Sequence, residues 1–188
     1  MPPKAKVSKE MVIDAALEVA RLTGAESINA RTVSQKLNCS TQPIMYHFKT
    51  IEDLKKAVYQ KADEYHTAYL NRIEADNPML GIGMAYIRFA AEEPFLFRFL
   101  FQSNSFSGKS IVELIDDETL EPILIVFSQG IQMDLTKTKD IFRVLFLFVH
   151  GYASMIANNT ISFDEKSIES DLELVFNGAI YMKQEETK

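Results

Sequence analysis

The amino-acid sequence predicts an all-α protein, and three observations support that fold class. Apolar residues recur at the three- and four-residue spacing of helices with one buried face, and no segment shows the strict alternation of a half-buried strand. Seven glycines and six prolines are few for a chain of 188 residues, which disfavours an all-β or loop-rich fold. Because 47% of the residues are hydrophobic, the chain can bury a core.

The first expected helix follows a short basic arm, residues 1–7, and runs from a cap at Ser8 to about Thr23. Its buried face is formed by four residues at helical spacing: Val12, Ala16, Val19 and Ala20. Gly24 stands where a left-handed residue commonly ends a helix. Asn29 is expected to cap the second helix.

The third expected helix is short and has a proline near its start. Asn38 and Cys39 form a tight turn, and Ser40 is expected to cap the helix. Pro43 then occupies the third helical position, where a missing N–H costs little because first-turn N–H groups have no intrahelical acceptor. We expect the helix to end at about His47.

The fourth expected helix is long. Thr50 and Asp53 form a variant of the capping box at its start. From Ile51 to about Ala75 the chain has neither glycine nor proline, and its apolar residues keep the spacing of one buried face. The helix is expected to end before Pro78.

The remainder of the chain also reads as helices separated by short connections. Residues 103–108 form the clearest loop. The expected helices are 79–93, 94–101, 110–116, 119–132, 137–159 and 165–183.

Charge is distributed unevenly along the chain. Residues 1–60 hold nine Lys and Arg and six Asp and Glu, a net charge of +3, whereas residues 61–188 hold eleven and twenty, a net charge of −9. A mildly basic end on an acidic body indicates a polyanionic partner at the N-terminal end only.

The cytoplasm is the expected location. A lone Cys39 excludes an intramolecular disulfide and a CxxC metal site, and the N-terminus lacks the pattern of a signal peptide. The twenty residues between Arg143 and Asp164 carry no Asp, Glu, Lys or Arg, which is the length of a membrane span. Their second half is polar, with Ser154 and Asn158 among others, so we expect a buried helix and a loop and no membrane partner.

Two short helices joined by a three-residue turn describe a helix-turn-helix, whose second helix enters the DNA major groove. Its start is Thr41-Gln42-Pro43. Gln42 can bond adenine through both amide atoms, and Thr41 and Pro43 offer apolar surface to thymine. Further groups are positioned to hold phosphates: Tyr46, His47 and the backbone N–H groups near Thr50.

The run from Val12 to Leu54 resembles the DNA-binding domain of the TetR (tetracycline-repressor-like) transcriptional regulators, most closely in NARTVSQKLNCSTQPIMYHFKTIEDL. The resemblance covers about a quarter of the chain. The positions that match the family pattern are Asn29, Arg31, Ser40, Ile44, His47, Phe48 and Leu54.

Three positions depart from that pattern. Met45 stands where the family usually has its first tyrosine, which leaves Tyr46 as the aromatic residue. Ile51 replaces a common lysine, so one expected phosphate contact is absent. Cys39 replaces a valine and is expected to act as a small buried apolar residue.

The resemblance implies an N-terminal helix-turn-helix DNA-binding domain, residues 1–52, and a C-terminal helical domain for effector binding and dimerisation, residues 53–188. It implies a homodimer that binds a palindromic double-stranded DNA operator and is released by a small, largely apolar effector. The expected DNA contacts are Arg31, Ser40, Thr41, Gln42, Pro43, Met45, Tyr46, His47, Lys49 and Thr50. Ile44 and Phe48 are expected to point inward.

The C-terminal helices supply candidates for an effector pocket. On the helix 137–159 a polar stripe follows one face of an apolar segment, and such groups must be satisfied by a pocket, a dimer interface or the core. His150 is more typical of a hydrogen-bonded core or interface residue, and Arg88 has the same alternatives. The candidate pocket residues are Met84, Arg88, Phe127, Leu147, His150 and Ser154.

Two other functions stay open beside a regulator. An enzyme is disfavoured, because Gly81 and Gly83 are not followed by the third glycine of a phosphate-binding loop, and the three histidines show neither metal spacing nor a nucleophile–base pair. We therefore expect no catalytic residue, no metal and no cofactor. The other alternative is a helical interaction or ligand-binding protein that has lost operator binding, which Met45 and Ile51 favour.

Overall fold

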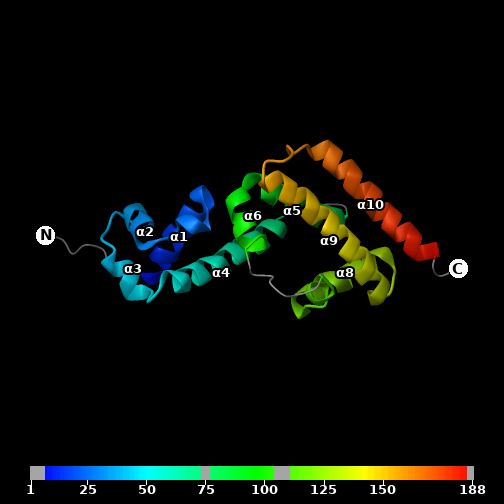
Figure 1. The fold of residues 1–188 in the computed structure, drawn as a ribbon. Helices are drawn as coiled ribbons and strands as arrows, with labels where there is room; N and C mark the ends of the chain where they lie inside the picture. Colours follow the sequence, from blue (N-terminus) through cyan, green and yellow to red (C-terminus); the bar gives the residue numbers. More distant parts are fainter. Residues whose placement is uncertain (1–6, 73–76, 104–110, 186–188) are drawn as a thin grey trace. The chain divides into compact units, whose positions relative to one another are not determined.

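The computed structural model describes residues 7–72, 77–103 and 111–185, and all regular structure in these ranges is helical (Figure 1). The all-α prediction is confirmed. The chain folds as two compact units, one formed by Met1–Ala68 and Glu93–Ser105, the other by Tyr69–Glu92 and Phe106–Lys188. The predicted functional division at residue 52 stays a prediction, since packing units and functional domains need not coincide.

Helix α1, Lys9–Thr23, opens the first unit and begins as predicted, because the Ser8 hydroxyl accepts the Met11 N–H at 3.1 Å. Its inner face buries Val12, Ala16 and Ala20. Gly24 ends the helix with φ 92° and ψ 155°, so the glycine has a positive φ but not the predicted left-handed helical conformation.

Helix α2, Ala30–Lys36, follows the 3-10 turn Ala25–Ser27 (η1). The predicted cap at Asn29 is confirmed. Its side chain accepts the N–H groups of Arg31 and Thr32 at 3.0 Å each, and the Thr32 hydroxyl accepts the Asn29 N–H at 3.1 Å. This reciprocal pair is a capping box, with threonine in the place of the usual glutamate.

Helix α3, Gln42–His47, starts later than predicted. The predicted cap at Ser40 is wrong: the cap residue is Thr41, whose side chain makes no capping hydrogen bond. With a cap at Ser40, the third helical N–H would belong to Pro43, which has none, so one of the two usual capping hydrogen bonds is lost. Asn38, with φ 50°, makes the tight turn before it.

Helix α4, Ile51–Leu70, is shorter than the predicted run to Ala75, of which residues 73–76 lie outside the described ranges. Thr50 caps it as predicted, since its hydroxyl oxygen accepts the Asp53 N–H at 3.0 Å. The hydroxyl donates in turn to the Asp53 carboxylate at 2.7 Å. Helix α6, Pro94–Phe101, completes this unit.

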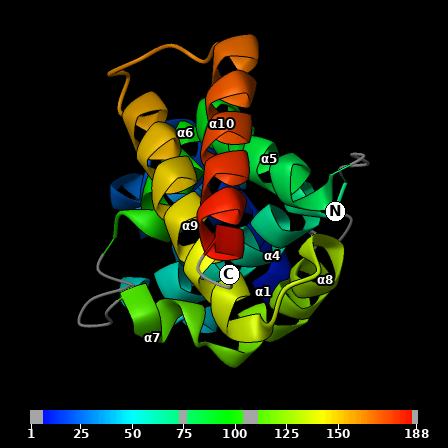
Figure 2. The same cartoon turned by 90° about the vertical axis from the view of Figure 1, so that its right-hand side faces the viewer.

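The second unit contains α5 (Pro78–Glu92), α7 (Ile111–Ile115), the 3-10 turn η3 (Glu118–Leu120), α8 (Glu121–Ile131), α9 (Leu135–Ala157) and α10 (Glu165–Glu185). Helix α9 is central, packing on α5, α8 and α10, and it lies beside α10 in Figure 2. A Cβ on Gly83 of α5 would lie 3.0 Å from Leu172 and 3.3 Å from Val149. The missing side chain therefore lets α5 approach α9 and α10 closely.

Helix α9 is long and apolar enough to cross a membrane by length and composition alone, a test that core helices also pass. Its inner face is buried against the neighbouring helices, at positions that include Ile141, Leu145 and Ala153. The predicted loop 103–108, apart from Ser103, and the predicted basic arm 1–7, apart from Val7, lie outside the described residues.

Candidate nucleic-acid interface and ligand pocket

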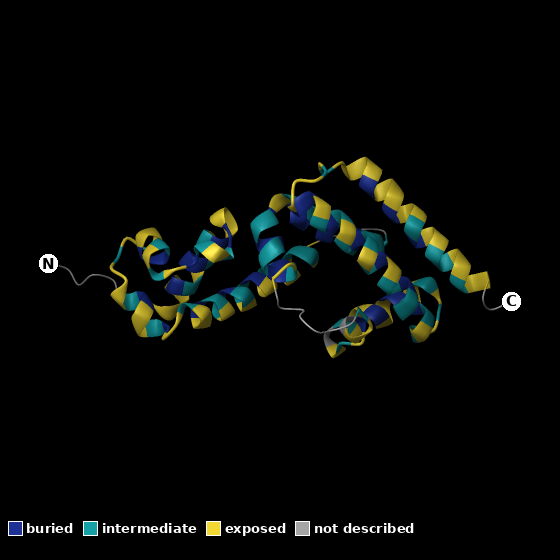
Figure 3. Ribbon diagram, viewed as in Figure 1, coloured by how far each residue is buried: buried dark blue, intermediate teal, exposed yellow. Residues whose placement is uncertain are grey.

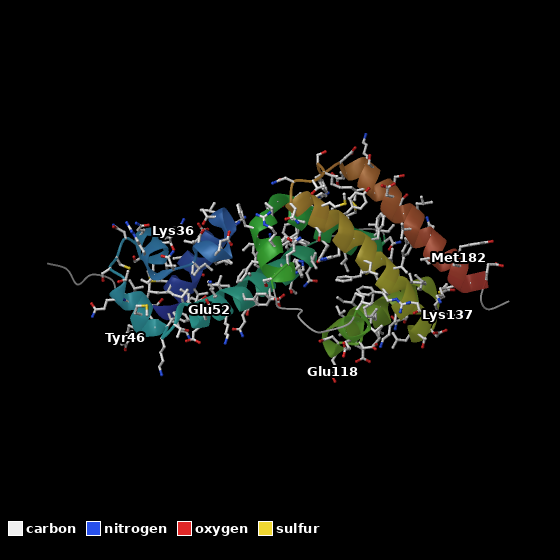
Figure 4. The ribbon with its side chains drawn as sticks, viewed as in Figure 1. Lys36, Tyr46, Glu52, Glu118, Lys137 and Met182 are labelled. Atoms are coloured by element: carbon white, nitrogen blue, oxygen red, sulfur yellow. The ribbon has the colours of Figure 1, made fainter. Side chains whose placement is uncertain are left out.

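The residues predicted to contact DNA lie on the surface of the first unit. Helix α3 is anchored by Ile44, which is fully buried, and by Phe48 just after it. Figure 3 shows buried and exposed positions alternating along the helices of this unit. These anchors turn the opposite face of α3 to solvent, where Tyr46 is 77% exposed (Figure 4). Of the ten predicted residues, Pro43 and His47 are half-buried and eight are exposed: Arg31, Ser40, Thr41, Gln42, Met45, Tyr46, Lys49 and Thr50.

His47 has a contact that the sequence did not predict. Its Nε2 lies 2.9 Å from the Val7 carbonyl oxygen, so the imidazole donates a hydrogen bond to the backbone that precedes α1. Lys9 adds a second link, with its ammonium group 5.3 Å from the centre of the Phe48 ring. The residues involved are about 40 positions apart, and no local pattern indicates such a contact.

Arg31 and Lys49 supply exposed positive charge on this surface. Other cations of the unit are neutralised nearby: Lys36 pairs with Glu18 at 2.8 Å, and Lys61 pairs with both Glu10 and Asp14. Within the part of the chain that the structure describes, neither Arg31 nor Lys49 forms an ion pair. Both side chains are therefore available to phosphate groups.

An ion pair with a buried carboxylate fixes the start of α6 to α1 in the same unit. The Glu93 carboxylate is only 5% exposed and accepts hydrogen bonds from Arg21 Nε at 2.7 Å and from the Tyr65 hydroxyl at 3.2 Å. The Arg21 guanidinium also lies over the Tyr65 ring at 5.5 Å. The hydrogen bond from Arg21 to Glu93 raises the pKa of Arg21 further above its usual value.

The second unit contains a cavity of about 670 Å³ at the start of α5, beside α8 and the C-terminal half of α10. Its walls are mainly apolar, and two of the lining rings, Phe127 and Phe176, have centroids 6.0 Å apart. The lining residues are Asn77, Pro78, Met79, Ile82, Pro122, Ile123, Val126, Phe127, Gly130, Ile131, Phe176 and Ile180.

Of the six predicted pocket residues, Phe127 lines this cavity and the other five do not. Leu147 is 54% exposed, and the Arg88 guanidinium pairs with the Glu165 carboxylate. Met84 and Ser154 are half-buried. A role of these side chains in ligand binding stays a prediction.

His150 is hydrogen-bonded inside the second unit. The Tyr86 hydroxyl lies 3.0 Å from His150 Nδ1, and the imidazole stacks on Phe146 with ring centroids 5.7 Å apart. Burial raises the pKa of Tyr86 and lowers the pKa of His150, so the phenol keeps its proton and donates a hydrogen bond to a neutral imidazole. This geometry favours the core alternative for His150.

The sequence reasoning missed most of the cavity because its walls come from helices far apart in the chain. One signal was present: the segment 121–131 carries more large apolar residues than a single buried face needs, and Val126 remains 60% exposed. Phe176 and Ile180, four positions apart, give a matching apolar edge on α10.

Comparisons with known proteins support the fold. No protein-family model matches the chain. The chain is 21% identical over 176 residues to the uncharacterized HTH-type transcriptional regulator YobS of Bacillus subtilis (strain 168), and the match covers 90% of each protein. Among solved structures it is similar to the multidrug binding protein EbrR complexed with imidazole, with a TM-score of 0.51, 19% identity, and coverage of 89% of this chain and 88% of that chain.

Proposed function

We propose that the protein is a homodimeric transcriptional regulator of the TetR type, most simply a repressor, that binds a palindromic operator and is released by a small, largely apolar effector. The observation that carries the proposal is the outward-facing surface of α2 and α3, held in place by the buried Ile44 and Phe48. The similarity to YobS, an uncharacterized HTH-type transcriptional regulator, supports the same conclusion.

Base reading is assigned to the first turn of α3 and phosphate binding to its surroundings. Thr41 and Gln42 are exposed at the N-terminal end of the helix, the part of a recognition helix that faces base edges. Arg31 and Lys49 are exposed cations suited to phosphates. The His47 Nε2 is engaged by Val7, so His47 would act on DNA through Nδ1 or by positioning the N-terminal segment.

Dimerisation is assigned to the outer faces of α9 and α10. These faces expose large apolar side chains, and contiguous exposed apolar surface is typical of a protein–protein interface. The side chains are Val144, Leu147 and Met155 on α9 and Leu174, Tyr181 and Met182 on α10. Gly151 and Gly178 lie on the same helices with open space where a Cβ would stand, which would allow close approach of a second copy.

A two-fold dimer would present two copies of α3, and an operator with half-sites about 34 Å apart would fit such a pair. An effector in the cavity of the second unit would act by a shift of population, because it must bind one dimer shape more tightly than the other. EbrR, the solved structure to which this chain is similar, is a multidrug binding protein, and this similarity supports effector binding here.

The test is selection of bound sequences from random duplex DNA, followed by titration of the best sequence. Gln42→Ala is expected to weaken specific binding about 5- to 150-fold, the value of one good base contact. Gln60→Ala, an exposed residue on α4 outside the predicted surface, is the matched control. Wild-type affinity should fall steeply with salt, as phosphate contacts require.

Failure to enrich any sequence would contradict the proposal and would favour the alternative of a helical interaction or ligand-binding protein. One observation supports this alternative. Met45 on α3 is 47% exposed and stands at a position where the family usually has tyrosine.

A further inference from the structure

We propose that the cavity of the second unit selects an uncharged, apolar molecule that carries a hydrogen-bond acceptor and excludes lipophilic cations. The proposal rests on the proposed function in taking this cavity as the effector site, and it adds the chemical class of the effector. The volume of the cavity, about 670 Å³, is that of a site for a drug-sized ligand.

The walls contain no group that would neutralise a charged ligand. Among the described residues that line the cavity none is ionisable, and only Asn77 carries a polar side chain. Moving an ion from water into such surroundings is costly unless a counter-charge meets it there. A neutral ligand avoids that cost and gains from the apolar walls.

The nearest charges along the lining helices are directed elsewhere. Glu121 precedes the lining residue Pro122 and is exposed, as is Glu118 (Figure 4), so both carboxylates remain hydrated. Lys183, beyond Ile180 on α10, pairs with Asp140 at 3.0 Å. Hydrated or paired charges at the rim contribute little to holding an ion inside.

Asn77 offers the NH₂ group of its side chain, which has two N–H donors, to the ligand. Its Oδ1 accepts the N–H groups of Met79 and Leu80 at 3.1 and 3.4 Å, so the oxygen is fixed against the start of α5. The other amide atom is therefore the NH₂ group, which has no hydrogen-bond partner within the described ranges. A ketone, ester or ether oxygen on the ligand would satisfy it.

The shape of the ligand follows from the walls. Phe127 and Phe176 give two rings inclined at 32°, and Met79 adds a flexible side chain that adapts to different outlines. A compact polycyclic ligand with a carbonyl at one end fits this lining better than a long flexible chain, because it loses less conformational freedom on binding.

The first experiment uses full-length protein and Nile red, a neutral polycyclic dye with a carbonyl acceptor, whose fluorescence rises in apolar surroundings. Displacement is measured with progesterone, a neutral ketone, and with tetraphenylphosphonium, a lipophilic cation. We expect progesterone to displace the dye at a concentration at least tenfold lower than tetraphenylphosphonium.

Gly130→Leu tests whether the dye binds in the cavity. Gly130 lines the cavity and has nothing within 4 Å of its Cβ position, so a leucine there is expected to occupy part of the cavity volume. We expect at least a tenfold loss of dye affinity. The matched control is Gln129→Leu, which adds the same side chain at the adjacent exposed position outside the lining and should leave dye affinity unchanged.

Asn77→Asp tests the donor. The carboxylate still caps α5 but replaces the NH₂ group by an acceptor oxygen and adds a negative charge. We expect about 3- to 10-fold weaker binding of progesterone, the value of one hydrogen bond, and tighter binding of tetraphenylphosphonium.

Equal affinity of wild-type protein for ketone and cation, or dye binding unaffected by Gly130→Leu, would overturn the proposal. Both readouts are independent of DNA. A protein that selects no operator but prefers the neutral ketone would contradict the proposed function alone, whereas an operator complex released only by cations would contradict this proposal alone.

Discussion

At the scale of single residues, the buried Glu93 carboxylate depends on its hydrogen-bond partners for its stability in the fold. It is 5% exposed and is held by Arg21 and Tyr65. Arg21→Ala would leave this charge buried without its cation. We expect a loss of about 2–3 kcal/mol in the free energy of unfolding, below the value for a fully buried pair because the Arg21 side chain is partly exposed.

Urea unfolding measures that change, and Lys61→Ala is the comparison. Lys61 pairs with the exposed carboxylates Glu10 and Asp14, so its removal should cost less than about 1 kcal/mol. Equal losses in the two variants would show that the Glu93 ion pair adds nothing beyond an exposed one.

Protonation of the buried His66 is expected to destabilise the folded protein in acid. The side chain is buried beside Phe101, and burial lowers its pKa to about 4. Because the folded pKa lies below that of the unfolded chain, the stabilising contribution is complete above about pH 6.5 and is lost as the pH falls toward about 4.

His66→Phe removes this titration while keeping an aromatic ring. Between pH 7 and pH 5 the wild type is expected to lose about 2 kcal/mol more stability than the variant, measured by urea unfolding at each pH. Parallel pH profiles of the two proteins would contradict the assignment.

At the scale of elements, the close packing of α5 makes Gly83 hard to replace. Alanine usually stabilises a helix by about 1 kcal/mol relative to glycine. At Gly83 the added methyl group would meet Leu172 and Val149, whereas at Gly130 it would meet nothing. We expect Gly83→Ala to be about 1–3 kcal/mol less stable than Gly130→Ala, by thermal or urea unfolding. Similar stabilities would mean that Leu172 moves aside freely.

Elements with local signals were predictable from the sequence, and those that depend on distant packing were not. Pro94 and the Asn29 cap marked α6 and α2 correctly because each acts within a few residues. Helix α4 ends at Leu70 although nothing in the sequence before Pro78 stops a helix. Helix α3 starts one residue later than predicted because Pro43 has no N–H to donate to a cap at Ser40.

The same distinction holds for the two candidate sites. Apart from Arg31 on α2, the predicted DNA contacts lie in one short stretch around α3, so their outward direction followed from the inward direction of Ile44 and Phe48. The cavity combines α5, α8 and α10, and Phe127 was the lining residue that the sequence placed there. The periodicity of apolar residues within one helix does not show which other helix its extra apolar residues contact.

At the scale of the whole molecule, the proposed dimer depends on side chains that do not support the single chain. Leu174 is 73% exposed, so Leu174→Glu should leave the helical content unchanged. We expect the variant to sediment as a monomer at micromolar concentration and to bind an operator far more weakly. Thr136→Glu, at an exposed position in the first turn of α9, is the control for added charge. If the Leu174→Glu variant remained dimeric, the dimer interface would have to lie on a surface that does not include Leu174.

Helix α10 lines the cavity with one face and contributes to the proposed dimer interface with the other. Phe176 and Ile180 face the cavity, whereas Leu174 and Tyr181 face outward on the proposed interface. A ligand that shifts this helix would change subunit affinity, and thermodynamic reciprocity would then make ligand affinity depend on protein concentration. Dilution would thus act as a regulatory variable, and the cellular abundance of the protein would set the effector level to which it responds.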